Sequence, residues 1–307
     1  MAQNDPQNIP YDKHLDLAPG AVQQVAPLVR RILCDNPGPF TFKGTVSYIV
    51  GRGKVAIVDP GPEDARHAAA LLDAVKGETV THIFVTHTHR DHSPGVPAIQ
   101  RATGAEVFAE GPHRASRPIH ADEASRMEGS GDMDFRPDRA LKDGEVVQGD
   151  GWALEAITTP GHTANHMAYA LRDTEILFSG DHVMAWSTPV VAPPDGAMGD
   201  YMASLQKLAA RREQIYFPGH GGAVRSAPRF VAAYILHRKA REASILNRLG
   251  ASPATIPDIV ASVYSTLDPR LTRAAGMSVL AHLEDLAARG LVATDGAPSL
   301  EGLYRLA

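Results

Sequence analysis

Thr86-His87-Thr88-His89-Arg90-Asp91-His92 is the stretch of this chain that decides its fold. Four of its seven side chains can bind a metal ion, and they directly follow the apolar run His82-Ile83-Phe84-Val85. That run predicts a buried strand. His87 and His89 are two positions apart, so at an extended strand end both side chains point to the same side.

The residues after this stretch predict a change from strand to helix. Ser93 is suited to the N-cap position and Pro94 to the first position of a helix. The turn between strand and helix then brings Asp91 and His92 round to face the two earlier histidines. A second metal ion becomes geometrically possible.

Three further candidate ligands lie downstream, each at the end of an apolar run. They are His162 in Thr-Pro-Gly-His, Asp181 in Phe-Ser-Gly-Asp and His220 in Phe-Pro-Gly-His. Ligands delivered separately by strand ends are what a metal site at the edge of a β-sandwich requires. Three or more histidines with an open position favour a catalytic site over a structural one.

The order H-x-H-x-D-H, then histidine, aspartate and histidine, resembles the metallo-β-lactamase fold superfamily over about residues 40–222. The superfamily is similar in carrying an acidic residue ahead of the metal motif, here Asp59 in Val-Asp-Pro-Gly. The wording Thr-His-Thr-His-x-Asp-His-Ser-Pro-Gly, together with the C-terminal tail, resembles the winged-helix-tailed, lactamase-beta-2-like branch, some of whose members are endoribonucleases. The resemblance implies an α/β fold, an αβ/βα sandwich with a C-terminal winged-helix domain.

The resemblance also implies a dinuclear metal site. Carried over position by position, it assigns one metal ion to His87, His89 and His162, the other to Asp91, His92 and His220, and a bridge between them to Asp181. Neutral imidazoles and carboxylates suit zinc, so we expect two Zn²⁺ per chain. The sequence does not decide whether iron or manganese replaces zinc in the cell.

The expected chemistry follows from two such ions. A bound water has its pKa lowered toward about 7, which supplies a metal-bridging hydroxide, and the second ion polarises the oxygen under attack. Asp91 is placed to orient that nucleophile and move its proton, and Asp59 to hold a ligand histidine. His166 is either a substrate contact or proton donor, or a hydrogen-bonded core histidine.

Composition describes an ordinary globular chain with 44% hydrophobic and 21% charged residues in 307. The single cysteine, Cys34, cannot form an internal disulfide, which favours a reducing compartment. Met1–Gly20 is polar and has no apolar segment typical of a signal peptide, and we expect a cytoplasmic protein without a membrane span. The net charge of −5 argues against bulk phosphate binding.

We expect a catalytic domain over residues 1–224 that alternates strands and helices. The predicted strands are Val25–Leu33, Val46–Val50, Val55–Val58, His82–Val85, Glu106–Ala109, Glu145–Val147, Ala153–Thr158, Met167–Leu171, Glu175–Phe178 and Gln214–Phe217, and the predicted helices are 62–76, Pro94–Thr103 and Tyr201–Arg212. The composition of residues 110–140 predicts either a mobile loop or lid beside the site, or an irregular solvent-exposed segment. Residues 182–200, with Trp186, are expected to wall a substrate groove.

Residues 225–307 are expected to form a long helix followed by a winged-helix domain. Helices are predicted at 227–249, 256–264 and 271–289, and a two-stranded wing at 291–294 and 300–306. This segment holds ten Lys/Arg and seven Asp/Glu, a balance that permits nucleic-acid contact. Arg270 and Arg273 could touch phosphate, serve dimerisation or pack over the active site.

Three functions remain open on the sequence alone. The first is a metal-dependent hydrolase of a small ester, thioester or lactone. The second is a single-strand endoribonuclease, disfavoured by the acidic catalytic half and by only 6% aromatic residues. The third is a binding protein with a vestigial metal site, disfavoured by the full set of ligands. The expected partner is a small-molecule substrate, with RNA as the alternative, and a homodimer through the wing stays open.

Overall fold

Two facing β-sheets form the centre of the computed structural model, which describes residues 9–120, 123–264 and 268–307. The first sheet has seven strands in chain order: β1 (Val22–Ala26), β2 (Val29–Leu33), β3 (Val46–Arg52), β4 (Lys54–Val58), β5 (Thr79–Phe84), β6 (Glu106–Ala109) and β7 (Arg139–Ala140). Strands β1 to β4 are antiparallel neighbours, and β4 to β7 run parallel.

The second sheet has six strands and is mostly antiparallel. Its order is β13 (Val224–Arg225), β12 (Ile215–Pro218), β11 (Ile176–Gly180), β10 (Met167–Leu171), β9 (Ala153–Thr158) and β8 (Val146–Gln148). The pair β11 and β12 is parallel. Strands β9 and β10 have the bounds that the sequence predicts.

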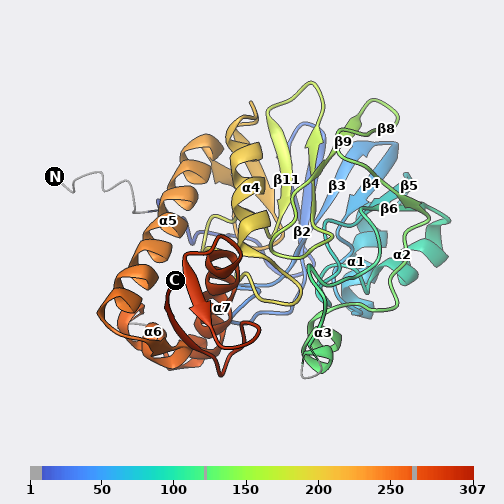
Figure 1. The fold of residues 1–307 in the computed structure, drawn as a ribbon. Coiled ribbons are helices and arrows are strands. Elements are labelled where there is room, and N and C mark those ends of the chain that lie inside the picture. Colours follow the sequence, from blue (N-terminus) through green and yellow to red (C-terminus); the bar gives the residue numbers. More distant parts are fainter. Residues whose placement is uncertain (1–8, 121–122, 265–267) are drawn as a thin grey trace.

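Helices cover the outer face of each sheet. Helices α1 (Ala65–Ala74) and α2 (Val96–Thr103) lie on one side, and α4 (Met198–Ala209) and α5 (Ala227–Ala251) on the other, with the strands between them (Figure 1). This layering is the predicted αβ/βα sandwich. Short α3 (Ala124–Ser130) lies in the segment 110–140.

Period-two alternation along the strands explains why the sheets face one another. In β3, Tyr48 and Val50 point into the core between the sheets, whereas Ile49 joins the core under α1 and α2. In β10, Tyr169 belongs to the inter-sheet core and Ala168 to the core under α4 and α5. Both faces of both sheets are therefore apolar and covered.

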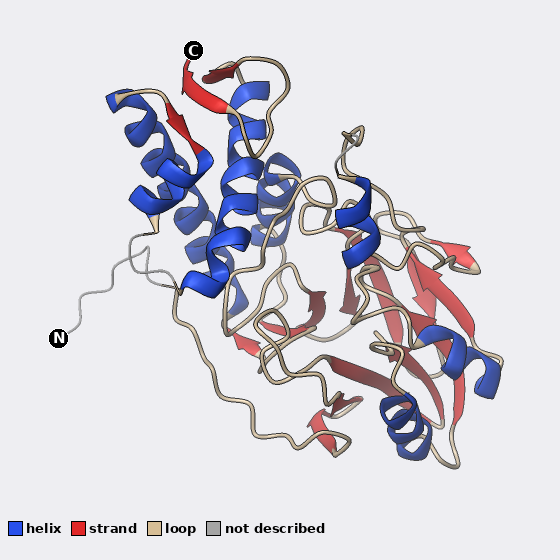
Figure 2. Cartoon of the chain, turned by 90° about the horizontal axis from the view of Figure 1, so that it is seen from below, coloured by secondary structure: helices blue, strands red, loops and turns tan. Residues whose placement is uncertain are grey.

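A separate core organises the C-terminal residues into a winged helix, with its helices grouped at one end of the molecule (Figure 2). It contains α6 (Ile256–Val263), the short 3₁₀ helix η1 (Pro269–Leu271), α7 (Thr272–Ala288), and the strands β14 (Ala254–Thr255), β16 (Leu303–Leu306) and β15 (Val292–Thr294). The expected boundary at residue 225 falls just before α5, whose first half packs on the sandwich and whose last turns, with Ile245 and Leu249, join the winged-helix core.

Two local predictions were wrong. The single strand expected at Val25–Leu33 is a hairpin of β1 and β2, because Pro27 has no N–H to continue a ladder. Ser93 is not the N-cap of α2, since its hydroxyl donates to Asp132 Oδ2 at 2.7 Å and the cap is Gly95. A Cβ at Gly95 would lie 2.6 Å from the carbonyl oxygen of Pro60, so only glycine fits this close approach.

Within the described residues, no helix has both the length and the apolar character needed to span a membrane.

Candidate metal centre

Seven predicted ligand residues, which we call the metal-ligand cluster, meet at one edge of the sandwich. They are His87, His89, Asp91, His92, His162, Asp181 and His220. The first four follow β5, and the others follow β9, β11 and β12 in turn. Buried strands of both sheets thus end at this edge, and each one delivers its ligands from a rigid support.

One part of the cluster consists of three imidazoles. His89 Nδ1 lies 3.1 Å from His87 Nε2 and 3.1 Å from His162 Nε2. His87 and His162 are buried, and His89 is partly exposed. A single ion at the centre of this triangle would have three nitrogen ligands.

The other part combines imidazoles with carboxylates. Asp91 Oδ2 lies 3.1 Å from His220 Nε2 and 3.4 Å from His92 Nε2. Asp181 Oδ2 lies between the two parts, 3.2 Å from His220 Nε2 and 3.7 Å from His162 Nε2. This position suits a carboxylate shared by two ions.

Outer hydrogen bonds orient every ring of the cluster. The ring nitrogen remote from the centre lies close to an oxygen in each case: His87 Nδ1 at 3.1 Å from Thr86 Oγ1, His89 Nε2 at 3.3 Å from Asp195 Oδ2, His92 Nδ1 at 3.0 Å from Asp59 Oδ2, His162 Nδ1 at 2.7 Å from the Val190 carbonyl and His220 Nδ1 at 3.3 Å from the Gly44 carbonyl. Carbonyl and carboxylate oxygens only accept, and the Thr86 hydroxyl already donates to Asp59, so each partner places the ring proton on that outer nitrogen.

In the three-imidazole part, the inner nitrogens of His87, His89 and His162 therefore present lone pairs to one another. Lone pairs about 3 Å apart repel unless a cation or a proton lies between them. Two further buried atoms, His92 Nε2 and Asp181 Oδ1, have no hydrogen-bond partner among the described residues. They also indicate that this site is built to bind a cation. The donor set fits a divalent metal of the zinc type.

The charge of the cluster agrees with this fit. Burial lowers the pKa of His162 to about 4 and holds the pKa of His87 well below its ordinary value, so both rings are neutral. In the part of the cluster that contains the carboxylates, burial also lowers the pKa of His220. The negative charges of Asp181 and Asp91 outweigh burial and raise that pKa to about 10. That end of the cluster attracts positive charge.

Asp59 takes the supporting place that the sequence analysis expects for it. Its carboxylate contacts His92 Nδ1 and accepts from the backbone N–H and the hydroxyl of Thr86, both at 2.7 Å. Thr86 in turn contacts His87. One buried carboxylate thereby orients ligands of both parts of the cluster.

His166 lies behind Asp181 and is fully buried. Its Nε2 accepts from the backbone N–H of Asp181 at 3.1 Å, which leaves its proton on Nδ1, 2.8 Å from the hydroxyl of Thr159. Burial lowers its pKa well below the ordinary value. Of the two roles considered from the sequence, this placement fits the hydrogen-bonded core histidine.

Asp195 and His113 are supporting residues that the sequence analysis missed. Besides contacting His89, Asp195 Oδ2 accepts from the hydroxyl of Ser130 at 2.8 Å, and its Oδ1 lies 3.5 Å from His113 Nε2. His113 Nδ1 lies 2.8 Å from Thr88 Oγ1. Asp195 stands in a turn signal, Pro-Pro-Asp-Gly, which gave no hint of a contact with a residue 106 positions away.

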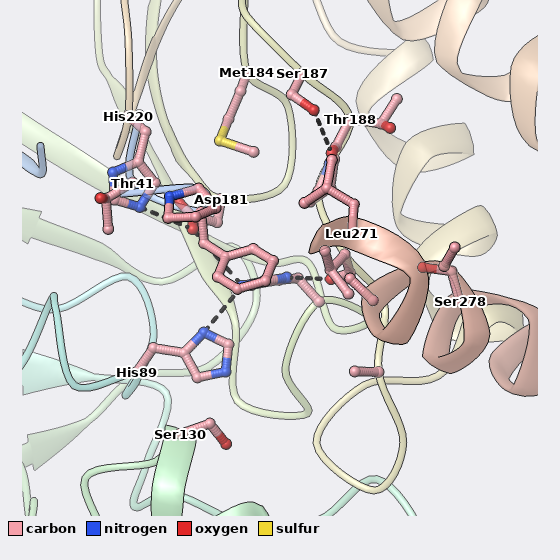
Figure 3. A pocket seen from close by; sticks show the side chains of 18 of the residues that line it. Thr41, His89, Ser130, Asp181, Met184, Ser187, Thr188, His220, Leu271 and Ser278 are labelled. Carbon is pink, nitrogen blue, oxygen red and sulfur yellow. Dashed lines mark hydrogen bonds and ion pairs between the residues drawn. The ribbon is translucent and has the colours of Figure 1, made fainter. Parts of the chain in front are cut away.

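A cavity of about 740 Å³ opens beside the cluster. The cluster forms one wall, with the loop carrying Met184, Trp186 and Thr188 along another. Leu271 and Ser278, from η1 and α7, lie opposite the cluster (Figure 3). The winged-helix domain therefore supplies part of the cavity wall, and the loop 182–200 lines the cavity as expected.

Fold and site together define a metal-binding αβ/βα sandwich that opens its metal centre to a cavity. Residues 40–220 match the model of the metallo-beta-lactamase superfamily, and residues 255–299 match that of the beta-lactamase associated winged helix domain. The chain belongs to the metallo-β-lactamase superfamily, whose fold implies a metal, and it is a hydrolase of that superfamily.

Individual relatives agree with this assignment. An atrochrysone carboxyl ACP thioesterase from Pseudocercospora fijiensis is 30% identical over 95% of this chain and 84% of its own length. A beta-lactamase-like protein 2 homolog from Caenorhabditis elegans is 32% identical over 88% of each chain. A crystal structure of a beta-lactamase domain protein from Burkholderia ambifaria has 21% identity and a TM-score of 0.80 over 99% of both chains, which supports the fold.

Proposed function

We propose that this chain is a dinuclear-zinc hydrolase that cleaves an acyl ester, thioester or lactone with water as the nucleophile. The observation that carries the proposal is the convergence of five imidazoles and two carboxylates, oriented from outside, at the wall of an open cavity. The relatives named as thioesterases support acyl chemistry.

Bound zinc would lower the pKa of a water to about 7 and polarise the carbonyl oxygen. His87, His89 and His162 would hold one ion, and Asp91, His92 and His220 the other, with Asp181 shared. Asp91 is the partly exposed carboxylate of the cluster and lines the cavity, so it is placed to orient the attacking water and accept its proton.

His166 acts on Asp181 rather than on substrate in this proposal. Its hydrogen bond from the Asp181 backbone and its contact with Thr159 fix the start of the turn that carries the bridging carboxylate. We therefore assign His166 a positioning role. A proton donor to the leaving group would have to come from another group that lines the cavity.

The walls of the cavity fit an acyl chain better than a polynucleotide. Trp186, Val190 and Leu271 offer apolar surface near the cluster. Arg270, one of the two arginines considered for phosphate contact, is exposed and pairs with Asp268 at 2.7 Å. Its charge is thus already balanced within the chain.

The test is a panel of nitrophenyl esters, acyl thioesters, lactones and labelled single-stranded RNA, assayed with zinc-loaded enzyme. We expect turnover of the acyl compounds that disappears on chelation and returns with Zn²⁺. The variant Asp181→Asn should lose turnover, and Asp134→Asn, an exposed acid in the segment 110–140, should keep it.

Two outcomes would count against the proposal. Turnover that survives exhaustive metal removal would exclude the metal mechanism. Cleavage of RNA without any acyl hydrolysis, lost in an Arg270/Arg273 double variant, would establish the endoribonuclease alternative instead.

A further inference from the structure

The cavity contains a second polar region, distinct from the metal-ligand cluster. Helix α5 contributes His237, Arg238 and Arg241 to its lining. Arg241 shares a face of the helix with the other two, since it follows His237 by four residues and Arg238 by three. Arg241 lies against the C-terminal end of α6, because its Nη1 donates to the Val263 carbonyl at 3.1 Å and its guanidinium lies over the Tyr264 ring, 4.6 Å from the ring centroid.

The cavity is lined by acidic and basic residues, and its acidic residues lie only at the metal-centre end, where Arg90 also lines the cavity. Its three acidic residues, Asp91, Asp181 and Asp195, all belong to the metal-ligand cluster or contact it. Among the described residues, neither Arg238 nor Arg241 forms an ion pair with a carboxylate. The cavity therefore carries positive charge in the α5 region that the chain itself leaves unbalanced.

Both guanidinium groups also have unused hydrogen-bond donors. The Nε atoms of Arg238 and Arg241 are buried without a partner among the described residues. Arg238 is 3% exposed, and its Nη2 is occupied by the Pro189 carbonyl at 2.6 Å. A desolvated cation with open donors raises the free energy of the empty site, and an anion that reaches it lowers that free energy.

We propose that Arg241, supported by Arg238 and His237, forms an anion subsite that binds a carboxylate or phosphate group of the substrate, at a distance from the scissile carbonyl. The planar fork of a guanidinium matches either oxyanion with two parallel hydrogen bonds. Apolar residues of the same cavity, among them Trp186, Ala274 and Ala275, offer surface for an aliphatic chain that joins the two groups. The substrate class is an acyl compound with a remote anionic group.

This inference rests on the proposed function for its chemistry, yet it is testable by binding alone. Zinc-loaded protein is titrated calorimetrically with linear dicarboxylates from adipate to dodecanedioate, and with monocarboxylates of the same lengths. Every acid offers a carboxylate to the metal centre, so any gain in affinity beyond the statistical factor for two equivalent ends belongs to the contact of the second carboxylate. We expect at least one dicarboxylate to bind about tenfold more tightly than its monocarboxylate partner.

The variant Arg241→Met should remove that difference, and Arg241→Lys should retain part of it because the charge remains. Lys239→Met is the matched control, since Lys239 is an exposed cation on the same helix. Melting temperatures of all variants are compared to exclude unfolding. A difference that survives in Arg241→Met, or no difference in the wild type at any chain length, overturns the subsite.

Turnover measurements provide a second test of the anion subsite. Mono-nitrophenyl esters of the diacids, of the corresponding ω-phosphono acids and of the monoacids separate carboxylate from phosphate recognition. The kcat/KM ratio of the preferred anionic ester to the neutral ester should fall about tenfold in Arg241→Met. Absence of hydrolysis for every ester would refute the hydrolase proposal, while the binding titration would still decide the subsite.

Discussion

Asp195 shows how a single residue outside the metal-ligand cluster controls a ligand of that cluster. Its Oδ2 accepts both from the hydroxyl of Ser130 and from His89 Nε2, so it holds the His89 ring with Nδ1 facing inward. His89 is the partly exposed histidine among the ligands. Without Asp195 the ring could rotate or change its tautomer, and the three-nitrogen part of the cluster would be less well organised.

We therefore expect Asp195→Asn to weaken zinc binding by about 10- to 100-fold. An amide can present its NH₂ group to His89 Nε2, which would leave the ring proton on the inner nitrogen. The affinity is measured by competition with a chromogenic chelator. Asp134→Asn, an exposed substitution of the same type, is the control. Equal zinc affinities in the two variants would show that Asp195 does not orient His89.

At the scale of elements, the segment 110–140 is tied to the winged-helix domain. Arg117 Nη1 donates to Glu123 Oε2 at 2.6 Å, and its Nη2 donates to Glu284 Oε1, on α7, also at 2.6 Å. Side-chain exposure is 22% for Arg117, 3% for Glu123 and 17% for Glu284, so the network is largely desolvated. The segment 110–140 and α7 both border the cavity, and the network holds their relative position.

Arg117→Met should lower the free energy of unfolding by about 1–3 kcal/mol at pH 7, because two neighbouring carboxylates lose their shared cation. The Arg117 hydrogen bond lowers the pKa of Glu123 from 4.5 to about 2, so this contribution is present above pH 4.5 and is lost as the pH falls toward 2. Burial instead raises the pKa of Glu284. In Arg117→Met, protonation of either acid removes negative charge that no longer has a neighbouring cation, and so reduces the loss of stability.

The gap in stability between wild type and Arg117→Met should consequently narrow as the pH falls from 4.5 toward 2. Urea unfolding at a series of pH values measures it. Arg136→Met is a control in the same segment, because Arg136 Nη1 donates to the backbone carbonyls of Met133 and Phe135 and to no carboxylate among the described residues. A gap that stays constant or widens in acid would contradict the role given to Glu123.

At the scale of the whole molecule, the metal-ligand cluster joins the two sheets. Its ligands follow β5 of the first sheet and β9, β11 and β12 of the second. A bound metal therefore links the two sheets and binds the folded chain in preference to the unfolded one. Binding of this kind stabilises the native state by mass action.

Zinc at 100 times its dissociation constant should raise the free energy of unfolding by about 2.7 kcal/mol. Chelation should remove that gain and lower the melting temperature, which differential scanning calorimetry records. Mg²⁺ at the same concentration is the control, since it prefers oxygen ligands to imidazoles. An identical melting temperature with and without zinc would mean that the seven residues do not bind zinc in the folded chain.

Much of the fold and of the site could be predicted because their signals are local. The bounds of β9 and β10 follow from apolar-rich runs that each lie within one short segment. The ligand types follow from side-chain chemistry, and H-x-H-x-D-H places four of them within six residues. The prediction of a single strand at Val25–Leu33 was wrong because a proline interrupts an otherwise suitable pattern.

Other features depend on contacts between distant segments, which local patterns do not encode. The pairing of His89 with Asp195 and the position of His166 behind Asp181 arise only when separate strand ends meet at one edge. Arg241 lines the cavity because α5 runs from the sandwich to the winged-helix domain. Side-chain chemistry and periodicity are properties of neighbouring residues, whereas partners and orientation are properties of packing, and packing exists only in the folded chain.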